Sequence, residues 1–199
     1  MKLFVTHYTP LASRKQNIIK QLNEAGIYDY EFIETYDSEQ LNKSDIEKFS
    51  QIKLSEISLF LKHIEIFKKE LDDIVVVLED DAILVDNFKD KLNKYLNELK
   101  NMNWDIVFSG ECCNLHIHKI DSNNNFYESN SSRGTCMYIL NKGICKKIND
   151  IVLMENKIIK PIDHWFNDMK PKYNLKYYWS EPTLVLQGSE VGMFNSAIR

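Results

Sequence analysis

The sequence contains few of the residues that mark fibrous, disulfide-rich or low-complexity proteins. Its 199 residues include six glycines, four prolines and four cysteines. Such scarcity of glycine and proline excludes a collagen-like or low-complexity chain. The cysteines at positions 112, 113, 136 and 145 lack the CxxC spacing of a zinc site, and the adjacent pair cannot easily form a disulfide. We therefore expect four reduced thiols in an intracellular protein.

Long hydrophobic runs and an excess of positive charge are also missing. No segment approaches the roughly 20 apolar residues of a membrane span, and the apolar stretch near the N-terminus is too short for a signal peptide. The formal net charge is −4, so the chain lacks the basic character typical of nucleic-acid-binding proteins. We expect a soluble, cytoplasmic protein that binds no nucleic acid; peripheral contact with a membrane stays open.

Segments typical of strands and helices alternate along the chain. Apolar runs or apolar–polar alternation predict strands at 2–8, 30–36, 74–78, 104–110, 135–140, 176–179 and 183–186. Helical spacing of apolar residues predicts helices at 13–25, 55–71, 88–99, 141–151 and 161–171, the last ended by a proline, and the polar segment 121–134 is expected to be a loop. This order predicts an α/β fold, with a mainly parallel central sheet flanked by helices, in a single domain spanning residues 1–199.

The strongest chemical signal is a run of three carboxylates directly after a buried strand. Residues 74–78 (IVVVL) are followed by Glu79, Asp80 and Asp81. Three acids at the end of a buried strand repel one another and are costly unless a cation lies among them. The usual solution is a divalent metal, Mg²⁺ or Mn²⁺, shared with the phosphates of a nucleotide. A solvated strand end or a helix N-cap cluster is the alternative, and the strongly apolar strand favours the metal site.

Histidines and one further acid give weaker signals. His63 follows Glu56 by about two helical turns, too far for a metal pair, so we expect a buried, hydrogen-bonded histidine. His116 and His118 would point the same way on a strand, as a metal pair does, but a surface hairpin is the favoured interpretation. Asp163 lies in the predicted first turn of a helix, where it could act as a base, although acids are favoured there for helix stability alone.

Six segments, in order, resemble glycosyltransferase family 25, the family of lipooligosaccharide and procollagen galactosyltransferases. They are VTHYTPLASRKQNIIKQLNEAGI with Arg14, LSEISLFLKHIEIFKKE with Glu56 and His63, VVVLEDDA, SRGTCMYILNKGICKKI, PIDHW and EPTLVLQGSEVGMFNSAI. The resemblance covers nearly the whole chain. It departs from the family's pattern at Ser58 and Leu59, which replace a cysteine or glycine pair, and at Lys62, which replaces a serine.

The resemblance implies a GT-A type nucleotide-sugar-binding fold and a part in lipopolysaccharide biosynthesis. It implies inverting transfer of a hexose, galactose or glucose, from a UDP-sugar to a hydroxyl of a glycan, lipooligosaccharide or protein acceptor. Asp81 and Asp80 would hold Mn²⁺ or Mg²⁺. The donor would be bound by Arg14, Glu79, Asp80, Gln187 and Ser189. Asp163 would be the catalytic base, with Glu181 and Glu190 as weaker candidates.

Two other functions stay open at this point. A metal-dependent nucleotidyl or phosphoryl transferase would use the same carboxylates on a different phosphate. A non-catalytic glycosyltransferase-like protein would keep the fold and bind carbohydrate without reaction, although such a protein need not keep three costly acids together.

Overall fold

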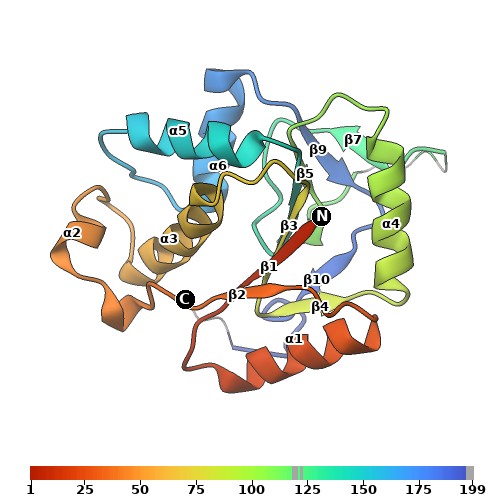
Figure 1. The fold of residues 1–199 in the computed structure, drawn as a ribbon, viewed down its shortest axis with the longest axis horizontal. Helices are drawn as coiled ribbons and strands as arrows, with labels where there is room; N and C mark the ends of the chain where they lie inside the picture. The colour runs from red at the N-terminus through yellow and green to blue at the C-terminus, as the bar shows by residue number, and fades with distance from the viewer. Residues whose placement is uncertain (118–120, 122, 196–199) are drawn as a thin grey trace.

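A seven-stranded sheet forms the centre of the molecule (Figure 1). The computed structural model describes residues 1–117, 121 and 123–195. Within these residues the strand order is β2-β1-β3-β8-β5-β9-β7. The strands are β1 (Lys2–Thr6), β2 (Glu31–Ile33), β3 (Val75–Glu79), β5 (Ile106–Phe108), β7 (Phe126–Glu128), β8 (Met137–Leu140) and β9 (Tyr177–Ser180). Five of the strands in this described sheet run in one direction, and β8 and β7 run against them. The α/β fold with a mainly parallel sheet is confirmed.

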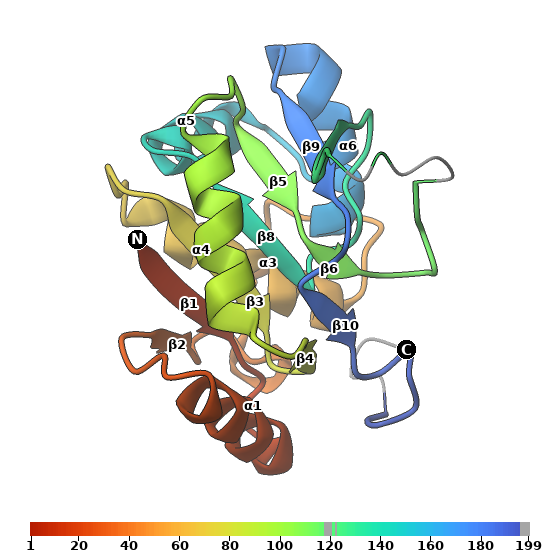
Figure 2. The ribbon, with the colours of Figure 1, turned by 90° about the vertical axis from the view of Figure 1, so that its right-hand side faces the viewer.

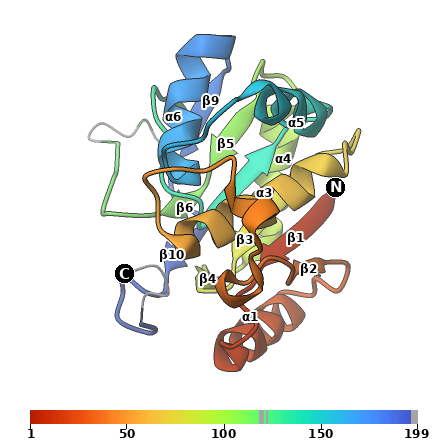
Figure 3. The same cartoon turned by 90° about the vertical axis from the view of Figure 1, so that its left-hand side faces the viewer.

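Helices cover both faces of the sheet (Figures 1 and 3). One face carries α3 (Leu54–Lys68), α5 (Ile144–Met154) and α6 (Ile162–Tyr173); the other carries α1 (Ala12–Glu24) and α4 (Phe88–Leu99). The short helices η1 (Ser38–Gln40) and α2 (Lys43–Ile46) lie between β2 and α3. Among the described residues, no helix is long and apolar enough to cross a membrane.

Strand β3 shows why the acidic run follows such an apolar segment. Every residue of this strand is buried, and its side chains alternate between the two faces of the sheet. Val75 and Val77 pack in the core under α3, α5 and α6, whereas Val76 and Leu78 pack in the core under α1 and α4. A strand covered on both faces needs apolar residues at every position, so polar residues begin only at its carboxyl end.

A second, smaller sheet brings the last part of the chain to the acidic run (Figure 2). Strand β10 (Val185–Gln187) pairs antiparallel with β4 (Ala82–Leu84) and parallel with β6 (Gly110–Glu111). The backbone N–H of Gly188 then donates a 2.8 Å hydrogen bond to the carbonyl oxygen of Asp81. A Cβ atom at Gly188 would lie 2.6 Å from that oxygen, so this close approach requires glycine.

Two expectations about the secondary structure were wrong. The polar segment 121–134 is not entirely loop, because residues 126–128 form β7, where buried Phe126 packs in the core and the backbone pairs with β9. Pro171 does not end a helix; it lies inside α6, which continues to Tyr173. Asn174 ends that helix in the left-handed conformation (φ 51°), which asparagine tolerates better than most residues.

Candidate functional site

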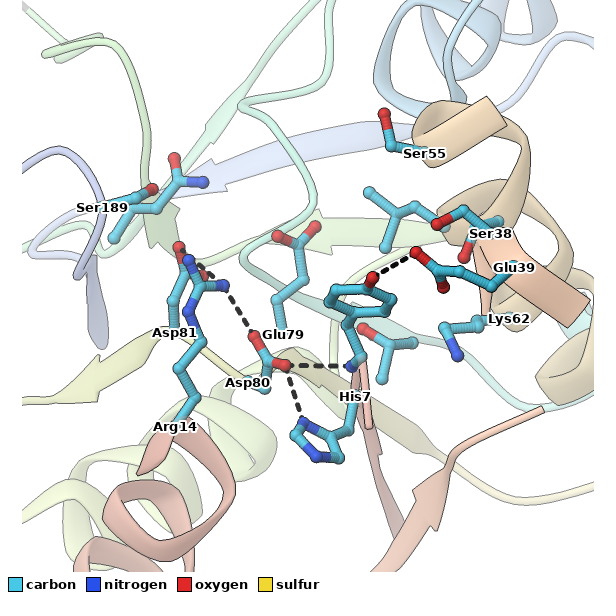
Figure 4. A pocket seen from close by; sticks show the side chains of 15 residues that line it. His7, Arg14, Ser38, Glu39, Ser55, Lys62, Glu79, Asp80, Asp81 and Ser189 are labelled. Atoms are coloured by element: carbon cyan, nitrogen blue, oxygen red, sulfur yellow. Dashed lines mark hydrogen bonds and ion pairs between the residues drawn. The ribbon is translucent and has the colours of Figure 1, made fainter. Parts of the chain in front are cut away.

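A cavity of about 270 Å³ opens at the carboxyl ends of β1 and β3 (Figure 4). Its walls include all six residues predicted to bind the donor or the metal. They are Arg14, Glu79, Asp80, Asp81, Gln187 and Ser189. Strand ends of this kind are where α/β sheets usually bind ligands. The cavity therefore joins segments from the first, middle and last parts of the sequence.

Asp80 has protein partners at both of its carboxylate oxygens. Its Oδ2 atom lies 2.7 Å from Nδ1 of His7 and accepts a 3.1 Å hydrogen bond from the backbone N–H of Tyr8, while Oδ1 accepts a 2.9 Å bond from Arg14. Burial alone would raise the pKa of Asp80, but these three hydrogen bonds outweigh it and hold the pKa below its usual value. Asp80 thus ties the end of β1 and helix α1 to β3.

Asp81 has a carboxylate oxygen that is buried without a hydrogen-bond partner among the described residues. This atom is Oδ1, and the side chain as a whole is also buried. Burial raises the pKa of Asp81, although hydrogen bonding with Ser189 and the charge of Arg14, 3.8 Å from Oδ2, act against the rise. A buried carboxylate oxygen without a partner is unfavourable, and a divalent cation is the kind of group that would satisfy it. The residues present therefore fit a metal.

Glu79 points into the middle of the cavity (Figure 4). Burial raises its pKa to about 8, and the negative charge of Asp81 adds to the effect. The hydroxyl of Thr135 donates a 2.5 Å hydrogen bond to Glu79 Oε1, which acts in the opposite direction. Burial and the neighbouring acids thus favour the protonated form of Glu79, whereas the bond from Thr135 favours the ionised form.

The opposite wall contains an ion pair that sequence reasoning missed. Lys62, on α3, is 2% exposed and lies 2.8 Å from the carboxylate of Asp37, which is also 2% exposed. Its ammonium group also donates a 2.6 Å hydrogen bond to the carbonyl of Thr35. The hydroxyl of Tyr8 donates a 2.5 Å bond to Glu39 on the same side. A lysine among the apolar residues of α3 was the available signal, because a buried lysine needs a partner.

A second cavity, of about 200 Å³, adjoins the first. Leu59, Glu79 and Gln187 line both cavities, and the second is also lined by Glu56 and Asp163. Asp163 is half-buried in the first turn of α6. The structure thus brings the predicted base next to the acidic run across a shared wall.

His63 lies outside both sets of lining residues. It is completely buried, and its Nδ1 atom lies 2.7 Å from the hydroxyl of Tyr138. The expectation of a buried, hydrogen-bonded histidine is confirmed. Glu56, its companion in the sequence motif, accepts a 2.7 Å hydrogen bond from the backbone N–H of Lys53 at the start of α3.

The remaining sequence candidates lie elsewhere. Residues 115–117 form no strand, so the strand on which a metal pair of His116 and His118 would depend is not found there, and His118 lies outside the described residues. The carboxylate of Glu181 is buried against Arg133 and lies 3.3 Å from His116. Glu190 accepts a hydrogen bond from the backbone N–H of Cys113. Neither glutamate lines the two cavities described above.

Comparison with known proteins gives a family and a fold. The family model of glycosyltransferase family 25 (LPS biosynthesis protein) matches residues 1–166. Among solved structures, a glycosyltransferase involved in the glycosylation of the major capsid of PBCV-1 is similar, with a TM-score of 0.51 and 10% identity over 94% of this chain and 92% of that one. A197 from STIV has a TM-score of 0.45 and 15% identity, over 93% of this chain and 83% of that one. No curated protein matches. The likeness to the PBCV-1 enzyme concerns the fold alone.

Proposed function

The chain belongs to glycosyltransferase family 25, and from this premise we propose that it transfers a hexose, galactose or glucose, from a UDP-sugar with inversion. The family implies a nucleotide-sugar donor and a glycan acceptor. We propose the hydroxyl of a glycan, lipooligosaccharide or protein as the acceptor group. The observation that carries the proposal is the Oδ1 atom of Asp81, which is buried at the end of a buried strand and has no hydrogen-bond partner among the described residues.

The first cavity is proposed as the donor site. Asp81, with Asp80 beside it, would hold Mn²⁺ or Mg²⁺, and the bound metal would supply charge neutralisation for the diphosphate leaving group. Arg14 presents a fixed positive charge to the same corner, because its guanidinium is buried and lies between Asp80 and Asp81. Gln187 and Ser189 supply polar groups on the closing side of the cavity, near the proposed nucleotide.

The second cavity is proposed as the acceptor site. Asp163 would take the proton of the acceptor hydroxyl as that oxygen attacks the anomeric carbon and the bond to UDP breaks. The hydroxyl and the leaving group would then lie on opposite sides of the sugar, which gives inversion. Glu79 and Gln187 line both cavities, which supports this placement of donor and acceptor, because the two substrates would meet there.

The proposal is tested by a panel of UDP-sugars, with and without Mn²⁺, in which the released product is identified. We expect one UDP-hexose to release UDP in the presence of Mn²⁺. Asp81→Ala should lower the rate by about 100-fold or more, because one metal-binding carboxylate is lost. Release of pyrophosphate or phosphate would favour a nucleotidyl or phosphoryl transferase. If no donor reacts and none raises the unfolding temperature, the proposal fails and a non-catalytic protein is favoured.

The role of Asp163 is tested by Asp163→Asn. We expect kcat for transfer to fall by about 100-fold or more, because removal of a general base typically costs that much. The KM for the UDP-sugar should change little, since Asp163 does not line the first cavity. Full transferase activity in this variant would remove Asp163 from the role of base.

A further inference from the structure

The side chains of Cys112, Cys113 and Glu190 meet at a place separate from the acidic run of Glu79–Asp81. Cys112 and Cys113 follow β6, and Glu190 follows β10. The two Sγ atoms are 3.4 Å apart, and Oε1 of Glu190 lies 3.8 Å from Sγ of Cys112 and 3.4 Å from Sγ of Cys113. All of these ligand atoms lie within 4.8 Å of one another.

These separations match the edges of one metal-coordination tetrahedron. Zinc binds sulfur at about 2.3 Å and carboxylate oxygen at about 2.0 Å, so two sulfurs around it are separated by about 3.8 Å and a sulfur and an oxygen by about 3.5 Å. The observed distances of 3.4, 3.8 and 3.4 Å are close to these values. One cation can therefore contact all three side chains with little rearrangement.

The backbone is shaped so that adjacent cysteines present both thiols together. In an extended strand neighbouring side chains point to opposite faces, but Cys113 has a left-handed conformation with φ 56°. Such a conformation in a residue other than glycine is costly and often marks a functional site. Gly134 leaves the space for Cys112, because a Cβ atom there would lie 2.8 Å from both Cβ and Sγ of that cysteine.

We propose that Cys112, Cys113 and Glu190 bind one thiophilic divalent cation such as Zn²⁺, at a site separate from the acidic run of Glu79–Asp81. Two sulfur ligands select a softer metal than an all-carboxylate corner does. On binding, the two thiols release their protons to solvent and three protein ligands hold the metal. The remaining tetrahedral position is then taken by water, as at other zinc sites with three protein ligands.

The site links the walls of the two cavities. Cys112 lines the second cavity, and Glu190 directly follows Ser189, which lines the first. A cation bound here would fix the turn after β10 to the loop after β6. The proposal does not depend on the transferase chemistry, since none of the three ligands lines the first cavity, which is the proposed donor site.

Co²⁺ is the direct probe, because its thiolate complexes absorb strongly through sulfur-to-metal charge transfer and its carboxylate complexes do not. The full chain, with its thiols shown to be reduced by thiol titration, is titrated with Co²⁺ alone. We expect a charge-transfer band that saturates at one equivalent and disappears when Zn²⁺ is added. Cys113→Ser should abolish the band, and Glu190→Gln should weaken Co²⁺ binding by about tenfold or more.

Two control variants separate this site from the others. Asp81→Asn removes the free carboxylate of the acidic run, and Cys145→Ala removes a buried thiol elsewhere in the core; both should keep the band. A reduced wild-type protein without the band would overturn the proposal. So would a band that survives in a Cys112→Ser/Cys113→Ser double variant.

Discussion

At the scale of single residues, His63 shows how burial fixes a charge state. Its side chain has no exposed surface, and burial lowers its pKa to about 3. The Nδ1 atom contacts the Tyr138 hydroxyl, whereas the Nε2 atom is buried without a hydrogen-bond partner among the described residues. The imidazole is therefore neutral in the folded protein, and it packs in the core without lining either cavity.

This charge state predicts how stability changes with pH. The unfolded chain binds a proton at His63 below its ordinary pKa of about 6.5, whereas the folded chain does so only near 3, so stability is lost as pH falls between these values. From pH 7 to pH 5 the loss from this group is about 2 kcal/mol of unfolding free energy. His63→Gln should show a correspondingly smaller loss in urea unfolding at the two pH values. Equal losses in both proteins would contradict the neutral, buried histidine.

At the scale of elements, the Lys62–Asp37 pair holds the segment before α2 against helix α3. Asp37 precedes η1, whose Ser38 and Glu39 line the first cavity. Asp37 also accepts a hydrogen bond from the backbone N–H of Thr9, which follows β1. This buried pair therefore joins three segments around one wall of the proposed donor site.

We predict that Lys62→Met lowers the unfolding free energy by about 3–5 kcal/mol, because it leaves the carboxylate of Asp37 buried without its cation. Adding Asp37→Asn to that variant should recover part of the loss. Lys68→Met, an exposed change on the same helix, should cost about 0.5 kcal/mol or less. Urea unfolding measures all three. Similar stabilities for Lys62→Met and Lys68→Met would show that the ion pair does not stabilise the fold.

The elements that the sequence predicts well are those whose signal is local. Residues 74–78 and 55–68 have strong apolar patterns that predict a strand and a helix. The position of the acidic run at the end of the sheet then follows, because the run comes directly after the strand. Strands β6 and β7 depend on partners far along the chain and have little pattern of their own. A lysine among the apolar residues of α3 indicates that it needs a partner, but spacing in the sequence does not identify that partner as Asp37, which lies far from Lys62 along the chain. The approach of Glu190 to Cys113 likewise joins segments far apart in the sequence.

At the scale of the whole molecule, the last part of the chain closes the proposed donor site. Gly188 bonds to the backbone of Asp81, and the ring of Phe194 lies 5.4 Å from the guanidinium of Arg14. Arg14 also donates a hydrogen bond to the carbonyl of Asn195. Helix α1, strand β3 and the segment after β10 thus all contribute to the first cavity, and Glu79 also lines the second cavity.

We propose above all that the first cavity binds a nucleoside diphosphate through a cation held by Asp81. Calorimetric titration of UDP into the protein, with and without Mn²⁺, tests it most directly. We predict binding that requires Mn²⁺, is weakened by about tenfold or more in Asp81→Asn, and is unchanged in Asp163→Asn, whose side chain lies in the second cavity. UDP affinity that is the same with and without Mn²⁺, or the same in wild type and Asp81→Asn, would contradict the claim.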